Sequence, residues 1–242
     1  MYVRPRFLVA GDSALVIEFG DRVSPEINAK VRRLSKFLEA SPVDGVTEVV
    51  PTYRSLLVHY DPRMSSLREL RSRLGKAIRE SEKVSLDGSR RVIMPVRYGG
   101  EFGPDIGDVA TYNKISVEDV IHIHSNTDYV VYMIGFIVGF PYLGELPKSI
   151  ACPRLKTPRV KVPAGSVGIA GTLTGIYPVE APGGWRLIGR TPLKLFNERS
   201  DPPSLLQAGD RVQFQSVTRS EYSKIAEKIR AGTYQLETSR VE

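Results

Sequence analysis

The sequence has a single cysteine, Cys152, and only three histidines among its 242 residues. One thiol excludes an internal disulfide framework and a zinc site built on several cysteines. Such a chain does not need an oxidising compartment, so we expect a cytoplasmic protein. Long hydrophobic runs are also missing, because the longest uncharged run, 129–144, falls short of the roughly 20 residues that span a bilayer. The first residues carry only a short apolar stretch, which excludes a secretory signal, and we expect no membrane contact.

A strong charge imbalance is absent as well. Lys and Arg number 34 and Asp and Glu number 27, which gives a net charge of +7. The excess is spread along the chain with one exception, the segment 148–161, which has five basic residues and no acidic one. A modest positive excess favours a small anionic ligand or an acidic partner. Aromatic residues do not alternate with the basic ones, so we expect no nucleic-acid partner.

The first 97 residues predict short strands that alternate with two helices. Ser24 before Pro25 is typical of a helix start, and Ser66 with Glu69 forms the capping box of a second helix. Apolar residues recur at helical spacing after each start. The predicted elements, in order, are strand 14–19, a helix from residue 25, strands 46–50 and 56–60, a helix from residue 67, and strand 91–96. The order β-α-β-β-α-β is typical of a ferredoxin-like domain.

The turn-forming residues Asp87–Gly88–Ser89 mark the predicted domain boundary. They divide the chain into a small N-terminal α/β domain, 1–88, and a second domain, 89–242. In the second domain glycine and proline separate short apolar runs, which favours a closed or sandwiched β-structure. Residues 219–232 predict a C-terminal helix that ends before a glycine. The fold class is therefore α+β.

Two of the three histidines, His122 and His124, lie on a short helix that the capping box of Ser116 and Asp119 predicts. Residues two apart on a helix point about 200° away from each other, so this pair does not form a zinc site, and we expect no metal. His124 ends the helix, where the helix dipole stabilises a protonated imidazole, and it is a candidate site residue.

Six glycines fall between residues 162 and 185. The segment matches neither a P-loop nor a GxGxxG motif. One interpretation is a set of tight β-turns, in which glycine permits positive φ angles. The other is an anion cradle, because Gly165 and Ser166 follow closely after the cations Arg159 and Lys161. The sequence leaves both interpretations open.

Aromatic residues are concentrated in segment 135–147, GFIVGFPYLGELP, which has no regular periodicity. Large aromatics on a glycine-hinged backbone either line a pocket or form a buried core loop. Trp185, the single tryptophan, has the same two interpretations. Cys152 has no activating neighbour in sequence, which indicates a structural thiol.

Several longer strings of this sequence are specific enough to indicate a family. They are GDSALVIEFGD (11–21), GGEFGPD (99–105), GFIVGFPYLGEL (135–146), TPRVKVPAGSVGIAG (157–171), TGIYP (174–178) and PGGWRLIGRTPLKLF (182–196). In this order, over residues 7–218, the chain resembles the KipI family, whose members are also called allophanate hydrolase subunit 1 or the B subunit of 5-oxoprolinase.

This resemblance implies a cyclophilin-like β-barrel as the second domain. It also implies a subunit of an ATP-hydrolysing 5-oxoprolinase, which converts 5-oxo-L-proline, ATP and water into L-glutamate, ADP and phosphate. The implied partners in a hetero-oligomer are a KipA-type subunit and a LamB/YcsF-type subunit. ATP with Mg²⁺ would act in the assembled complex, with no cofactor held tightly by this chain. The alternatives are a regulatory inhibitor of a sensor histidine kinase, as KipI is, or an allophanate hydrolase or urea carboxylase-type carboxyltransferase subunit.

The resemblance implies roles for particular residues as well. His124 aligns with a His-Ser dipeptide of the family, and Arg159 aligns with the arginine before VPAGS. The expected catalytic residues are His124, Arg159 and Ser166. The expected substrate-binding residues are Phe140, Tyr142, Lys161, Gly165 and Tyr177. Leu173 stands where the family commonly has a glutamine, which is the residue type that hydrogen-bonds an amide-like substrate.

Overall fold

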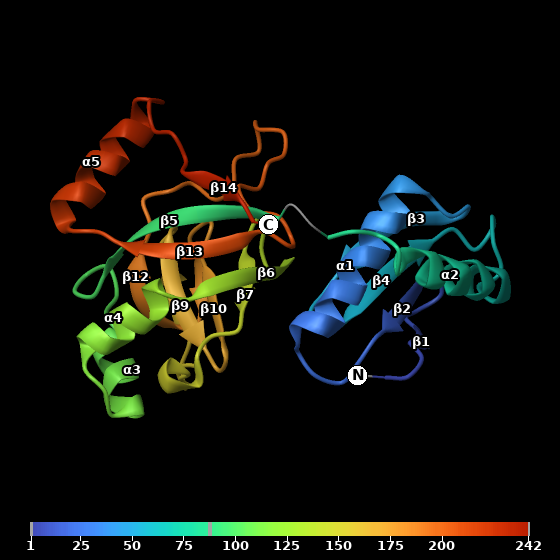
Figure 1. Cartoon of the computed structure of the whole chain (residues 1–242), viewed down its shortest axis with the longest axis horizontal. Coiled ribbons are helices and arrows are strands. Elements are labelled where there is room, and N and C mark those ends of the chain that lie inside the picture. The colour runs from blue at the N-terminus through green and yellow to red at the C-terminus, as the bar shows by residue number, and fades with distance from the viewer. Residues whose placement is uncertain (1, 87–88, 242) are drawn as a thin grey trace. The chain divides into compact units, whose positions relative to one another are not determined.

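The computed structural model describes residues 2–86 and 89–241. The chain divides into two compact units, Met1–Asp87 and Gly88–Glu242 (Figure 1). Two residues of the predicted boundary turn, 87 and 88, lie outside the described residues. No helix within the described residues is both long and apolar enough to cross a bilayer. The two units are described separately below.

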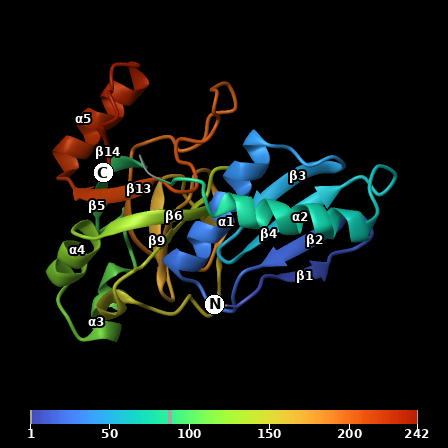
Figure 2. The same ribbon diagram turned by 45° about the vertical axis from the view of Figure 1, so that its right-hand side comes forward.

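The N-terminal unit is a four-stranded antiparallel sheet with two helices on one face (Figure 2). Its sheet order is β1-β2-β4-β3. The helices bury the predicted apolar stripes against the sheet, for example Leu34 of the first helix and Leu74 of the second. The elements are β1 (Arg6–Val9), β2 (Ala14–Glu18), α1 (Pro25–Ala40), β3 (Val46–Pro51), β4 (Ser55–Tyr60) and α2 (Leu67–Ser81).

Both predicted helix starts of this unit are confirmed. The Ser24 side chain accepts a hydrogen bond from the backbone N–H of Ile27 at 3.3 Å. Ser66 and Glu69 form a complete capping box, in which each side chain bonds the other residue's backbone N–H. These caps satisfy N–H groups that a helix leaves without intrahelical partners, which is why the helices begin at these positions.

The prediction that strand 91–96 completes the N-terminal sheet is wrong. That segment is β5 (Arg90–Tyr98), and it belongs to the sheet of the second unit. The edge position beside β2 is taken instead by β1, which the sequence did not predict. Most of β1 is exposed, so it lacks the buried alternation that identifies a strand. β5 carries Met94 and Val96 into the larger core, which explains its place in the other unit.

Seven described strands of the second unit close into a barrel. The order is β12-β9-β10-β7-β6-β13-β5, and β5 pairs again with β12 through Tyr98 and Gly189. The pair β5–β13 is parallel, and β14 (Thr238–Arg240) adds to the start of β5. The other barrel strands are β6 (Asp128–Ile134), β7 (Pro141–Gly144), β9 (Ser166–Ala170), β10 (Leu173–Ile176), β12 (Arg186–Arg190) and β13 (Arg211–Ser216). Closure removes the exposed edges that an open sheet would have.

Short helices and one ribbon complete the second unit. The helices α3 (Ile106–Asn113) and α4 (Val117–Ser125) lie together beside the barrel (Figure 1). The predicted capping box of α4 and the predicted C-terminal helix, α5 (Arg219–Arg230), are both present. The remaining elements are the 3-10 helix η1 (Lys148–Ile150) and the paired strands β8 (Arg159–Val162) and β11 (Ala181–Gly183). The expectation of a mixed α and β chain with a closed barrel is thus confirmed.

Candidate functional site

The second unit has a pocket beside the turn that joins β9 to β10. Its volume is about 510 Å³. It lies between this turn, the aromatic segment around β7 and the basic segment after η1. The lining residues are Phe136, Tyr142, Pro153, Arg154, Ala170, Gly171, Leu173, Tyr177 and Trp185. Two of the predicted substrate-binding residues, Tyr142 and Tyr177, therefore line one pocket.

Phe140 supports the pocket from behind. It is buried, and its ring lies 4.9 Å from the ring of Tyr142, 5.2 Å from Tyr177 and 5.4 Å from Trp185, measured between centroids. A Cβ on Gly175 would come 2.9 Å from the Phe140 ring, so glycine is needed there for the ring to occupy this place. Phe140 thus packs against three aromatic side chains that line the cavity and does not itself line it.

The pocket combines aromatic walls with one cation. Arg154 is exposed and is the charged residue among the described lining residues. Burial raises the pKa of the phenols of Tyr142 and Tyr177. A hydrogen bond with the Trp185 backbone opposes this rise in pKa at Tyr177, and the charge of Arg154 opposes it at both residues. Both hydroxyls are therefore protonated at neutral pH and can donate hydrogen bonds. A flat molecule with one anionic group suits this combination.

Arg159 lies close to this pocket but is already paired. Its Nη2 donates to Asp105 Oδ1 at 2.7 Å, and Asp105 Oδ2 accepts the backbone N–H of Leu187 at 2.7 Å. Arg159 pairs with Gly183 across β8 and β11, and a Cβ on Gly183 would overlap the Tyr177 hydroxyl, so Arg159 lies near this wall of the pocket. Nη1 of Arg159 is buried and has no hydrogen-bond partner among the described residues. Nη1 of Arg159 is therefore unsatisfied, whereas Nη2 is held by a buried carboxylate.

The turn at Gly165 and Ser166 is not an open anion cradle. The Gly165 N–H donates to the Tyr177 carbonyl at 2.7 Å, and the Ser166 N–H donates to the Pro163 carbonyl at 3.2 Å. Gly165 has a φ of +80°, and a Cβ there would overlap the Thr191 carbonyl. Ser166 is fully buried. The sequence left open whether the glycine-rich segment forms tight turns or an anion cradle. At Gly165 and Ser166 the structure shows a tight turn.

Lys161 lies apart from the pocket lining. Its Nζ pairs with Glu180 Oε1 at 3.2 Å, with both side chains mostly exposed. The oxygen Oγ of Ser166 is buried and has no hydrogen-bond partner among the described residues.

Of the eight predicted site residues, the structure brings Tyr142 and Tyr177 together in the pocket, with Phe140 behind them and Arg159 near them. It does not bring Lys161, Gly165, Ser166 or His124 into the lining.

His124 is enclosed in the barrel core. Its ring stacks on Phe214 with 4.4 Å between centroids, and its exposed fraction is 0%. The hydroxyl of Thr174 donates to the Gly168 carbonyl at 3.0 Å, so it must accept the proton of His124 Nε2 at 2.9 Å. Nδ1 then carries no proton and accepts from the Tyr98 hydroxyl at 2.8 Å. The geometry fixes a neutral imidazole with both nitrogens satisfied.

We expect this histidine to make the barrel less stable in acid. Burial lowers the pKa of His124 to about 3, whereas an unfolded histidine has a pKa of about 6.5. Between these values the unfolded chain binds a proton that the folded chain does not. The free energy of unfolding therefore falls by about 1.4 kcal/mol per pH unit below about pH 6.5.

Denaturant unfolding at pH 7 and pH 5 measures this effect. The variant His124→Gln serves as the reference, because it loses the hydrogen bonds at both pH values but carries no titrating ring. The wild-type protein should lose more stability than the variant between the two pH values, and equal losses would contradict a neutral buried histidine. A ¹⁵N NMR spectrum should show the Nε2–H tautomer at pH 6.

The sequence missed Arg154 as a pocket residue and left the place of Trp185 undecided. Arg154 was one of five basic residues in segment 148–161, and no local pattern distinguishes it from the others. Trp185 was open between core and pocket wall, and the structure shows both, since it is 7% exposed and lines the cavity. Within the described residues, no cluster of three or more acidic, histidine or cysteine side chains has a geometry that holds a metal ion.

The second unit is a closed seven-stranded barrel with an aromatic pocket, and it belongs to the cyclophilin-like class of β-barrel domains. The comparisons give the family: residues 5–206 match the model described as carboxyltransferase domain, subdomain C and D, and the chain belongs to this family. It is 43% identical over 243 residues to the 5-oxoprolinase B subunit of Bacillus subtilis, covering 94% of this chain and 99% of that protein.

Solved structures agree with this assignment. The chain is 50% identical to the conserved uncharacterized protein PH0987 from Pyrococcus horikoshii, with a TM-score of 0.54, covering 90% of this chain and 100% of that one. It is also similar to the K. lactis urea amidolyase, with a TM-score of 0.82 at 22% identity, covering 98% of this chain and 16% of that one. The second likeness shows the fold alone.

Proposed function

We propose that this chain is the B subunit of an ATP-hydrolysing 5-oxoprolinase. The observation that carries the proposal is the 43% identity to a protein of that name across almost the whole of both chains. The pocket supports it, because 5-oxo-L-proline is a flat ring with one carboxylate. Arg154 can bind the carboxylate, and the rings of Tyr142 and Trp185 can enclose the lactam.

Opening the lactam ring requires groups that bind and activate ATP in addition to the pocket of this chain. A lactam is a poor electrophile, so ATP must activate it before water can open the ring. The Gly165 and Ser166 amides already donate to backbone carbonyls, and the described pocket lining has one guanidinium. We therefore assign ATP with Mg²⁺ to the assembled complex and give this chain the task of holding 5-oxoproline. We propose that the phenols of Tyr142 and Tyr177, which line the pocket, donate hydrogen bonds to the lactam oxygen, which Leu173 cannot do.

Partner subunits follow from the same proposal. We propose a hetero-oligomer with a KipA-type and a LamB/YcsF-type subunit. In the K. lactis urea amidolyase the matched region is 16% of the chain, so a similar segment works there as one part of a much longer protein. A second candidate function, carboxyl transfer with a biotin-bearing partner, is favoured by the description of the family model.

The N-terminal unit is proposed to be ferredoxin-like in a rearranged form. Its two helices and the strands β2, β4 and β3 occupy the places expected for that fold. The edge strand beside β2 comes from the N-terminus as β1 and not from the segment after α2. We propose that this unit and the barrel, divided near residue 88, are two domains.

Steady-state kinetics of the reconstituted complex test the function. The complex should hydrolyse ATP only when 5-oxoproline is present. Arg154→Ala should raise KM for 5-oxoproline about ten- to hundredfold with a smaller change in kcat, since a charge-assisted hydrogen bond to the bound carboxylate is lost.

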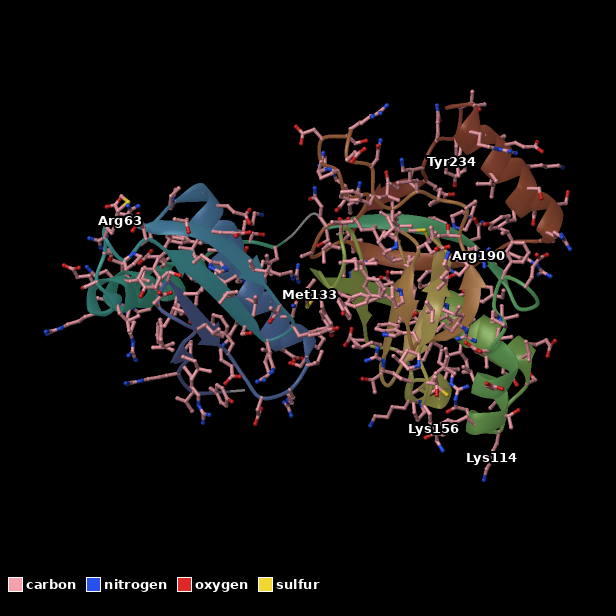
Figure 3. All side chains as sticks on the ribbon, turned by 180° about the vertical axis from the view of Figure 1, so that it is seen from behind. Arg63, Lys114, Met133, Lys156, Arg190 and Tyr234 are labelled. Atoms are coloured by element: carbon pink, nitrogen blue, oxygen red, sulfur yellow. The ribbon has the colours of Figure 1, made fainter. Side chains whose placement is uncertain are left out.

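Lys156→Ala is the matched control, because Lys156 belongs to the same basic segment but is exposed and lies outside the pocket lining (labelled in Figure 3). This control should keep the wild-type KM. A complex that hydrolyses no ATP with 5-oxoproline but transfers a carboxyl group from biotin would support the second candidate. An unchanged KM in Arg154→Ala would remove Arg154 from the substrate site.

A further inference from the structure

The N-terminal unit has a cavity of its own. Its volume is about 290 Å³, and it lies where the residues before β1, the first half of α1 and the end of α2 meet (helices in Figure 2). The lining residues are Tyr2, Val3, Pro5, Phe19, Lys30, Arg33, Ile78, Ser81 and Glu82. This volume is at the lower end of small-molecule sites, which favours a ligand of amino-acid size.

One side of this cavity is positive. Lys30 and Arg33 are three positions apart on α1, so they share a face of the helix. Arg33 Nε donates to the Val84 carbonyl at 3.2 Å, which restrains this side chain and does not use its Nη groups. Lys30 makes no hydrogen bond or ion pair with any described residue of the chain. Both side chains are half-buried.

The end of α2 supplies negative charge to the other side of this cavity. Glu82 is the C-cap residue of this helix, and the last turn of a helix carries a partial negative charge. Its carboxylate forms no ion pair within the described residues, although two cations line the same cavity. The Ser81 hydroxyl donates to the Ile78 carbonyl at 2.7 Å, so its proton is already used. Phe19 and Ile78 supply apolar wall between the charges.

We propose that this cavity binds a free α-amino acid with an apolar side chain. Lys30 and Arg33 bind its carboxylate, Glu82 and the end of α2 bind its ammonium group, and Phe19 and Ile78 contact its side chain. A simple anion meets repulsion from Glu82, and a simple amine meets repulsion from the two cations. Only a molecule that carries both charges satisfies both sides of the cavity.

Isothermal titration of the full chain with L-phenylalanine tests the proposal. We expect saturable binding of one molecule per chain. Phenylpropionate lacks the ammonium group and phenethylamine lacks the carboxylate, and each should bind at least about tenfold more weakly, because one charge-assisted contact is missing. Equal binding of either analogue, or no heat with L-phenylalanine, would overturn the proposal.

Single substitutions test whether L-phenylalanine binds in this cavity. Lys30→Ala and Glu82→Gln should each weaken L-phenylalanine binding about tenfold or more. Their matched controls, Lys76→Ala and Glu48→Gln, alter exposed charges outside the cavity lining and should bind as wild type.

Arg154→Ala separates this inference from the proposed function, because Arg154 belongs to the barrel pocket. L-Phenylalanine binding should survive this substitution. Loss of binding in Arg154→Ala together with normal binding in Lys30→Ala would place the amino acid in the barrel pocket and overturn the proposal.

Discussion

Gly103→Ala is expected to destabilise the barrel unit strongly. Gly103 lies in the loop that crosses β12 before α3, and a Cβ at this position would overlap the carbonyl of Ile188. The loop cannot simply move away, because Gly99 N–H donates to the Ile188 carbonyl at 3.0 Å and Asp105 N–H donates to the Leu187 carbonyl at 2.9 Å. Overlap with backbone atoms costs about 3 kcal/mol or more, a large share of a domain's stability.

Denaturant unfolding followed by tryptophan fluorescence measures this loss. The chain has one tryptophan, Trp185, and it lies in the barrel unit, so the signal reports on that unit. Gly107→Ala is the matched control, since this glycine is exposed on the outer face of α3 with nothing within 4 Å of an added Cβ. That substitution should raise the stability by about 0.5–1 kcal/mol. A Gly103→Ala protein as stable as wild type would contradict the close contact with β12.

Asp105→Ala is expected to destabilise the barrel unit by about 3–5 kcal/mol, the usual cost of removing one partner of a buried ion pair. The Asp105 side chain is 7% exposed and joins two strands. It bonds Arg159 of β8 and the backbone of Leu187 in β12, and it precedes α3 as N-cap residue. Without it, Arg159 keeps a partly buried charge with no partner. Arg159→Ala should therefore also lower stability, so a loss of activity in that variant does not by itself show a catalytic role.

Glu180→Ala is the comparison for this prediction. Glu180 pairs with Lys161, which lies two residues after Arg159 on the same strand, but this pair is mostly exposed. Its removal should cost no more than about 1 kcal/mol. The measurement is the free energy of unfolding from denaturant curves of both variants. Equal losses in the two variants would show that the Asp105–Arg159 pair behaves as a surface pair.

Local features of this fold could be predicted from the sequence, and distant pairings could not. The helix starts at Ser24 and Ser66 depend on residues within three positions of each other, so the pattern is visible in the sequence. The strand 91–96 was also predicted as a strand, but its neighbour is not local. Arg91 pairs with Arg211, 120 positions later, and nothing near β5 indicates that partner. Its assignment to the N-terminal sheet was wrong for that reason.

The same contrast between local patterns and distant contacts explains which residues of the candidate site could be predicted. The aromatic segment indicated a pocket, and Tyr142 lines one. The sequence could not select Arg154 from five nearby cations, because the selection depends on which of them faces Tyr177 and Leu173. The end of a helix suggested a protonated His124 in a functional site. The structure buries this ring because Thr174, 50 positions later, and Tyr98 supply partners for both nitrogens inside the barrel.

The parallel pair β5–β13 has a consequence for the growing chain on the ribosome. β5 begins at residue 90, and the strand that it pairs with along most of its length begins at residue 211. The N-terminal sheet needs only residues before 61, with near neighbours in sequence. Long-range pairing folds slowly, because a large loop must close before the contacts form. We expect the first unit to fold during synthesis, whereas β5 cannot pair with β13 until residues 211–216 have been synthesised.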